Sequence, residues 1–154
     1  MNWRSEVRRP AGFSLLELIV VLAILGLGFA FVAPRFARSY EGLRFRTAVR
    51  EVADGLRTAR GIALSQGREV VFILDVDEHR YRIDGRKFRP LPDFIDLTLE
   101  TVAGEQENPD RGRIRFFADG SATGGRVILA WKGRRRRVDV NWLTGRVAIA
   151  DLSP

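Results

Sequence analysis

Residues 12–36 read GFSLLELIVVLAILGLGFAFVAPRF, and this stretch decides how the rest of the chain is organised. From Phe13 to Ala33 there are 21 residues, of which Glu17 alone carries a formal charge. A helix of that length spans about 31 Å, the thickness of a hydrocarbon core. The run also lacks the polar stripe of a helix in a soluble core. We therefore expect residues 13–33 to form a membrane-spanning helix.

The apolar run does not fit a cleaved secretory signal. Such signals have a shorter apolar region followed by a small-residue cleavage site, whereas Pro-Arg-Phe follows this run at residues 34–36. The small residues stand before the run instead, at Ala11-Gly12. Arginine counts conflict with a cytoplasmic N-terminus, because three arginines precede the run and five follow it up to Arg50.

Glu17 is the unusual residue of the run, because a carboxylate within a membrane segment is costly and suggests a partner. Cleavage after Gly12 would place the free amine of Phe13 at the same end of the helix. The Glu17 carboxylate of one subunit could then pair with the amine of the next. The alternative is a glutamate side chain that reaches back to the membrane surface.

The sequence Gly12-Phe13-Ser14-Leu15-Leu16-Glu17, after a basic leader and before an apolar helix, resembles the prepilin signature of type IV pilins and type II secretion pseudopilins. The resemblance implies that a prepilin peptidase removes the leader, residues 1–12, after Gly12. It implies methylation of Phe13 and a role for Glu17 in assembly of a helical filament. The leader would be cytoplasmic, and residues 34–154 would be a periplasmic domain anchored by one pass through the bacterial inner membrane.

The chain beyond residue 34 continues with a pattern typical of an amphipathic helix. Gly67 fits the C-cap of such a helix, and Arg50 and Asp54 are spaced to pair on its exposed side. We expect the apolar side to pack on a sheet of the same chain rather than in a coiled coil. Six residues at alternating spacings of four and three form that side: Phe45, Val49, Val52, Leu56, Ala59 and Ala63.

After Gly67 the pattern changes to alternating strands separated by turn residues. A long helix followed by strands predicts an α+β domain in which antiparallel sheets pack on the helix. We expect a polar loop at residues 103–112. The expected strands are residues 70–75, 81–83, 93–102, 113–117, 127–131, 136–142 and 146–149.

Residues 113–129, RIRFFADGSATGGRVIL, and residues 136–149, RRVDVNWLTGRVAI, resemble the end of the GspH/FimT group. That group contains a minor pseudopilin of type II secretion, pseudopilin H, and FimT-like minor type IV pilins. The resemblance implies a structural subunit near the tip of the periplasmic pseudopilus, which drives export of folded proteins across the outer membrane. Its partners would be the prepilin peptidase, the major pseudopilin and other minor pseudopilins. The alternative is a FimT-like minor pilin that binds DNA in natural transformation.

The sequence holds no set of residues typical of an enzyme, and we expect neither a catalytic site, a cofactor nor a metal. Cysteine is absent, which excludes disulfides and thiolate metal sites. His79 is the only histidine, so a catalytic triad or a zinc site lacks its partners. We expect an exposed structural histidine. Asp75, Asp77 and Glu78 lack the spacing of a calcium loop and predict a turn instead.

The remaining candidate for binding is a basic cluster of four residues: Arg134, Arg135, Arg136 and Arg137. Strand alternation predicts that Val138, Val140 and Trp142 face the core, whereas Arg135 and Arg137 face outward. The cluster can contact DNA phosphates or an acidic surface of another subunit, and we favour the subunit.

The resemblance bears on this choice as well. FimT-like proteins that bind DNA resemble one another in a Gly-Arg-any-Arg motif near the C-terminus. At the matching place this chain has Gly145-Arg146-Val147-Ala148, which lacks the second arginine. The formal charge of +7 is compatible with either partner.

Overall fold

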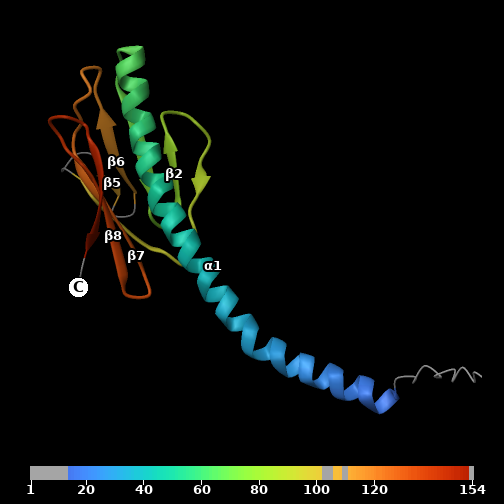
Figure 1. The fold of residues 1–154 in the computed structure, drawn as a ribbon. Helices are drawn as coiled ribbons and strands as arrows, with labels where there is room; N and C mark the ends of the chain where they lie inside the picture. The colour runs from blue at the N-terminus through green and yellow to red at the C-terminus, as the bar shows by residue number, and fades with distance from the viewer. Residues whose placement is uncertain (1–13, 102–105, 109–110, 153–154) are drawn as a thin grey trace, which may run out of the picture. The chain divides into compact units, whose positions relative to one another are not determined.

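The computed structural model describes residues 14–101, 106–108 and 111–152, and for residues 29–39 and 106–108 it describes the backbone only. The chain divides into two compact units, one ending at Glu41 and the other beginning at Gly42. One long helix, α1 (Leu15–Gln66), contributes to both units (Figure 1). The strands described after it are β1 (Val70–Asp75), β2 (Arg80–Ile83), β3 (Arg89–Pro90), β4 (Asp96–Glu100), β5 (Gln106–Asn108), β6 (Arg111–Phe116), β7 (Gly125–Trp131), β8 (Arg134–Val140) and β9 (Val147–Leu152).

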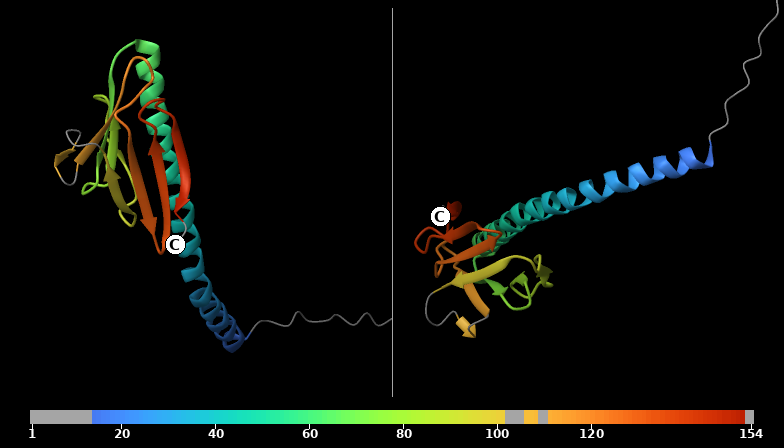
Figure 2. Two further views of the ribbon diagram at one scale, coloured as in Figure 1. Left: turned by 90° about the vertical axis from the view of Figure 1, so that its left-hand side faces the viewer. Right: turned by 90° about the horizontal axis from the view of Figure 1, so that it is seen from below.

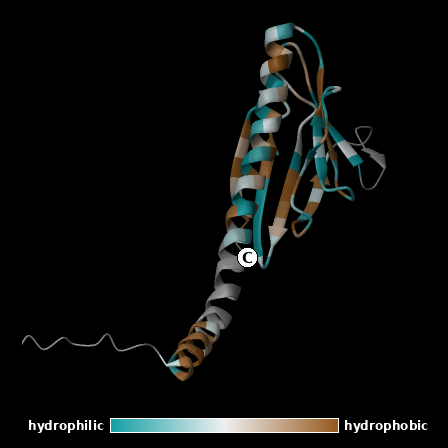
Figure 3. Cartoon of the chain, turned by 90° about the vertical axis from the view of Figure 1, so that its right-hand side faces the viewer, coloured by the Kyte–Doolittle hydropathy of each residue, from teal (hydrophilic) through white to brown (hydrophobic). Residues whose placement is uncertain are grey.

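In the first unit, Ser14 caps the start of α1. Its Oγ accepts a hydrogen bond from the Leu16 N–H at 3.3 Å, and its carbonyl oxygen accepts one from the Leu18 N–H at 3.1 Å. The large apolar side chains between Leu15 and Leu27 are all exposed, and Figure 3 shows this part of the helix in brown. Within the described residues, no helix combines the length and the hydropathy needed to cross a membrane. Phe13 and the side chains of residues 29–33 lie outside that description, and the predicted span stays a prediction.

In the second unit, the helix face predicted from the spacing is the buried face of α1. All six predicted residues from Phe45 to Ala63 are at most 2% exposed. Glycine lets the sheet approach the helix closely, because a Cβ on Gly55 would lie 2.9 Å from a ring carbon of Tyr81 and 3.0 Å from one of Phe72. The predicted cap at Gly67 is confirmed, with a φ of +60°. These contacts make the second half of α1 part of the domain core.

The strands form two antiparallel sheets that lie along the second half of α1 (Figures 1 and 2). One sheet has the order β3-β2-β1-β6-β5, and the other has the order β4-β7-β8-β9. The first packs on α1 through stacked Phe72 and Tyr81, whose ring centroids are 5.3 Å apart. The second packs through Trp131, whose ring centroid is 5.9 Å from that of Phe45. The predicted α+β architecture is confirmed.

The structure differs from the prediction at several places on the surface. Residues 103–112 were expected to form a loop, but β5 and the start of β6 pair there as a hairpin. The strand expected at residue 93 begins at Asp96, because residues 93–94 form a turn. Asp54 pairs with Arg57 at 2.9 Å, so the expected pair with Arg50 is wrong.

Trp142 was expected in the core but is 66% exposed. The Asn141 side chain ends β8 early, because its Oδ1 accepts hydrogen bonds from the Leu143 and Thr144 N–H groups at 3.0 and 2.9 Å. An asparagine in this arrangement imitates a backbone turn. The strand alternation therefore stops at Val140, and Trp142 lies on the turn toward β9.

Candidate functional site

The predicted processing residues, Gly12 and Phe13, lie outside the described residues. Glu17 is exposed in the first turn of α1, three positions after Ser14. Serine at the N-cap with glutamate three residues later is the pattern of a capping box, and the carboxylate also interacts favourably with the helix dipole. Glu17 is thus placed to stabilise the start of its own helix. The Ser-x-x-Glu spacing could have indicated this capping role from the sequence.

Asp77, Glu78 and His79 form a turn between β1 and β2. His79 is half-buried rather than exposed as expected, and its Nε2 lies 3.0 Å from the Ile95 carbonyl oxygen. The Asp75 carboxylate is held by Arg111 and by the Glu78 N–H. Residues 76–79 form the predicted turn. In the described part of the chain, no group of three or more His, Asp or Glu residues is placed to hold a metal ion.

The β7–β8 hairpin divides the four arginines of the basic cluster into two pairs. Arg136 forms an ion pair with Asp151 on β9, and the Arg137 Nε lies 2.9 Å from an Asp139 carboxylate oxygen. The Arg134 guanidinium carbon lies 5.8 Å from the centroid of the buried Trp131 ring. Among the described residues, Arg134 and Arg135 have no carboxylate within ion-pair distance. Arg136 and Arg137 are therefore neutralised within the chain, whereas Arg134 and Arg135 are available to bind an anionic partner.

A small pocket of about 220 Å³ lies between this hairpin and the start of the second unit. We call it the basic pocket. Four of its residues are arginines and one is an aspartate, which gives its lining a formal charge of +3. The lining consists of Phe45, Arg46, Gly133, Arg134, Arg135, Arg136, Asp151 and Leu152.

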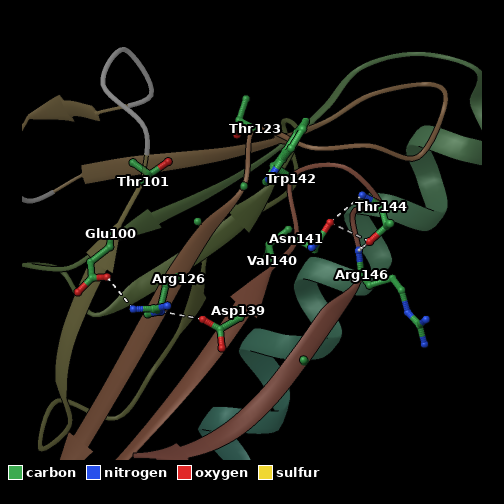
Figure 4. Close-up of a pocket in the computed structure, with 13 residues that line it drawn as sticks. Glu100, Thr101, Thr123, Arg126, Asp139, Val140, Asn141, Trp142, Thr144 and Arg146 are labelled. Carbon is green, nitrogen blue, oxygen red and sulfur yellow. Dashed lines mark hydrogen bonds and ion pairs between the residues drawn. The ribbon is translucent and has the colours of Figure 1, made fainter.

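A larger groove of about 790 Å³ opens at the outer face of the four-stranded sheet (Figure 4). A chain of ion pairs crosses it: Arg126 lies 3.4 Å from the Glu100 carboxylate and 2.7 Å from that of Asp139. The hydrogen bond to Asp139, together with its charge, raises the pKa of the Arg126 guanidinium above its ordinary value. The indole of Trp142 forms another part of the wall. The groove therefore combines balanced charges with one exposed aromatic ring, and aromatic and arginine side chains are enriched at protein interfaces.

The segment compared with the DNA-binding motif also lines this groove, through Arg146 and Ala148. Ala148 is the register partner of Asp139 on the neighbouring strand. A methyl group beside a carboxylate thus occupies the position of the motif's second arginine. This part of the groove offers little attraction for a phosphate.

Two sequence profiles of known families match parts of the chain. Residues 48–145 match the family described as type II transport protein GspH. Residues 7–33 match the prokaryotic N-terminal methylation motif.

Among characterised proteins, the chain is 36% identical over 140 residues to the type II secretion system protein H of Xanthomonas campestris pv. campestris, covering 91% of this chain and 83% of that protein. Its fold resembles the minor pseudopilin EpsH of Vibrio cholerae, with a TM-score of 0.56, 14% identity, and coverage of 69% of this chain and 95% of EpsH. It also resembles the type IV minor pilin FimU of Pseudomonas aeruginosa, with a TM-score of 0.55, 16% identity, and coverage of 74% and 91%. At these identities the two structures establish the fold alone.

Proposed function

This chain belongs to the GspH family of type II transport proteins, and from that premise we propose that it is a minor pseudopilin of a type II secretion system. The observation that carries the proposal is the presence in one chain of the family match at residues 48–145 and the methylation motif at residues 7–33. The protein would be a structural subunit near the tip of the periplasmic pseudopilus. It would help to drive folded proteins across the outer membrane.

The proposed topology is a single pass through the inner membrane at residues 13–33. The leader would be cytoplasmic and residues 34–154 periplasmic. A prepilin peptidase would cut after Gly12 and methylate Phe13. The methylation motif supports this processing. Insertion by dedicated machinery would explain why five arginines follow the span on the periplasmic side, although arginines usually mark the cytoplasmic side.

Assembly would use two parts of the chain. At the start of α1, the exposed apolar side chains would pack in the filament core and Glu17 would face the N-terminal amine of a neighbour. On the periplasmic domain, Trp142 and Leu143 are 66% and 63% exposed on one turn. Tryptophan and arginine side chains often dominate the binding energy of protein contacts, so this turn and the basic cluster are the surfaces proposed to meet the other pseudopilins.

A DNA-binding minor pilin is the second candidate. One observation favours it, namely the guanidinium groups of Arg134 and Arg135, which have no carboxylate within ion-pair distance among the described residues. The pairing of Arg136 and Arg137 with aspartates, and the alanine at position 148, weigh against it.

A gene deletion in the native host separates the two functions. For a minor pseudopilin, we expect proteins normally exported by the secretion system to remain in the periplasm, whereas DNA uptake is unchanged. Mass spectrometry of the native protein should show a chain that begins at methylated Phe13. Unchanged export together with lost transformation would reverse the assignment, and a mature chain that begins at Met1 or near Pro34 would contradict the proposed processing.

A further inference from the structure

The basic pocket carries an unbalanced charge among the described residues. Arg46 comes from α1, whereas Arg134 and Arg135 come from the β7–β8 hairpin. All three are exposed, and within the described residues none of them has a carboxylate within ion-pair distance. Only Arg136 is compensated, by Asp151. Three arginines from two separate elements thus converge on one opening, where an anionic ligand would be attracted.

The hairpin is held beside the first residues of the second unit. A Cβ on Gly42 would lie 3.5 Å from the Trp131 ring, and the Trp131 and Phe45 rings are in contact. Along the chain, Gly42 follows Ala33, the last residue of the predicted span, by nine positions. Nine residues of helix extend about 14 Å. The covalent tether between the predicted span and the second unit is therefore nine residues long, and this length limits how far the basic pocket can lie from the membrane surface when the span is inserted.

We propose that the basic pocket binds the headgroup of an anionic phospholipid at the periplasmic surface of the inner membrane, before the subunit enters the filament. The inference rests on the proposed function, because it requires the membrane-anchored topology. Arginine binds phosphate oxygens through paired N–H groups, and four arginines line this pocket of about 220 Å³.

The membrane anchor favours a lipid over a soluble anion as the occupant. A tethered site meets headgroups at a permanently high local concentration, whereas a free ligand must be captured from solution. Each basic residue near an anionic membrane surface strengthens attraction by about fivefold. The proposal also gives a function to Arg46, one of the five arginines that follow the span.

The test uses the full chain in nanodiscs of phosphatidylcholine, with or without phosphatidylglycerol, and measures amide hydrogen exchange of residues 132–137. We expect phosphatidylglycerol to slow exchange in the hairpin, and high salt to remove the effect. The variant Arg134→Gln/Arg135→Gln should lose roughly 25-fold in headgroup affinity, and with it the protection. The matched control, Arg86→Gln/Lys87→Gln, removes two exposed charges beside residues 51–58 of α1 and should keep the protection.

Equal exchange in the two kinds of nanodisc, or protection that survives the Arg134→Gln/Arg135→Gln change, overturns the proposal. Inorganic phosphate that slows exchange of residues 132–137 equally well in nanodiscs of phosphatidylcholine alone would reveal a site for free anions. That result would overturn the proposal too. A chain that does not insert contradicts the topology of the proposed function and this inference with it. An inserted chain without lipid-dependent protection contradicts this inference alone, because export and Phe13 methylation are measured separately in cells.

Discussion

The Asp75 carboxylate lies 2.5 Å from a guanidinium nitrogen of Arg111, its register partner across the β1–β6 ladder. Asp75 is 3% exposed and is the one buried charged residue in the described part of the chain. Burial raises the pKa of this carboxyl, but hydrogen bonds from Arg111 and the Glu78 N–H and the charges of Arg111 and Arg80 outweigh it. The net pKa lies below the ordinary 3.8.

The Asp75–Arg111 pair predicts an acid-sensitive contribution to stability. A carboxyl with a lowered pKa in the folded state stabilises the fold above its unfolded pKa, and this contribution disappears as the pH falls through the folded value. We expect Asp75→Asn to lower the free energy of unfolding by about 2 kcal/mol at pH 7. The difference from the unmodified chain should shrink at acidic pH.

Urea denaturation at neutral and acidic pH measures this difference. The matched control is Asp54→Asn, which breaks the exposed pair with Arg57 and should cost less than about 0.5 kcal/mol. A loss for Asp75→Asn that is the same at both pH values would show that packing, rather than charge, accounts for it.

Two glycines with similar backbone angles should respond very differently to alanine. Gly145 and Gly133 have φ values of +60° and +78°. A Cβ on Gly145 would lie 2.1 Å from the Gly120 carbonyl oxygen, whereas one on Gly133 meets no atom within 4 Å. Gly133→Ala should cost only the backbone strain, about 1 kcal/mol. Gly145→Ala should cost at least about 3 kcal/mol because two packed turns must separate. Thermal unfolding of both variants measures the difference in stability. Equal losses of stability would mean that the turns at Gly120 and Gly145 can separate at little cost.

The sequence predicts the interior of this fold better than its surface. The six predicted residues between Phe45 and Ala63 are buried as expected, because apolar residues at helical spacing lie on one face of α1, and that face packs on the sheets. The ion pair between Arg136 and Asp151, in contrast, depends on the register of β8 and β9, which cannot be predicted from the local sequence pattern. The exposure of Trp142 was not predictable from strand alternation either. The Asn141 side chain ends β8 before Trp142, so Trp142 is exposed instead of buried.

The candidate sites divide in the same way. Gly12, Phe13 and Glu17 can be proposed from the sequence because the peptidase signature is contiguous, and their roles stay predictions. The basic pocket cannot be proposed in this way, because Arg46 and Arg134 are far apart in the chain and are brought together by the packing of Trp131 near Gly42.

The second half of α1 should be indispensable for folding of the periplasmic domain. It supplies the buried residues from Phe45 to Ala63, against which both sheets pack. A fragment of residues 35–154 should be soluble and unfold cooperatively in circular dichroism. A fragment of residues 67–154 should not, because its sheets lose their apolar cover. Cooperative unfolding of the shorter fragment would show that the sheets form a core without the helix.

Two substitutions at Glu17 separate its local effect from its proposed contact with a neighbour. Glutamine preserves the capping-box pattern with Ser14 but removes the charge, whereas leucine removes both. If Glu17 pairs with the N-terminal amine of the next subunit, Glu17→Gln and Glu17→Leu should both insert in the membrane and both cross-link poorly into filaments. Site-specific cross-linking in cells, with membrane fractionation, measures this. Normal incorporation of Glu17→Gln would assign the residue to helix capping instead.

The last prediction separates secretion from DNA uptake by the salt dependence of binding. Each phosphate contact in duplex DNA contributes a log–log slope of about −0.9. Four free arginines would give about −3.6, but Arg136 and Arg137 already pair with aspartates, so binding through Arg134 and Arg135 gives about −1.8. We therefore expect weak, sequence-independent binding of the full chain in neutral detergent, measured by fluorescence anisotropy.

The two pairs of arginines provide their own control in this experiment. Arg134→Gln/Arg135→Gln should reduce the magnitude of the slope by about 1.8, whereas Arg136→Gln/Arg137→Gln should change it little, because those guanidinium groups already lie against carboxylates. Binding at micromolar concentration or tighter in physiological salt, abolished by Arg134→Gln/Arg135→Gln, would instead favour the DNA-binding minor pilin. A slope near −3.6 that both double variants reduce equally would show that DNA displaces Asp139 and Asp151 from their arginines, since only then are all four cations available to phosphate.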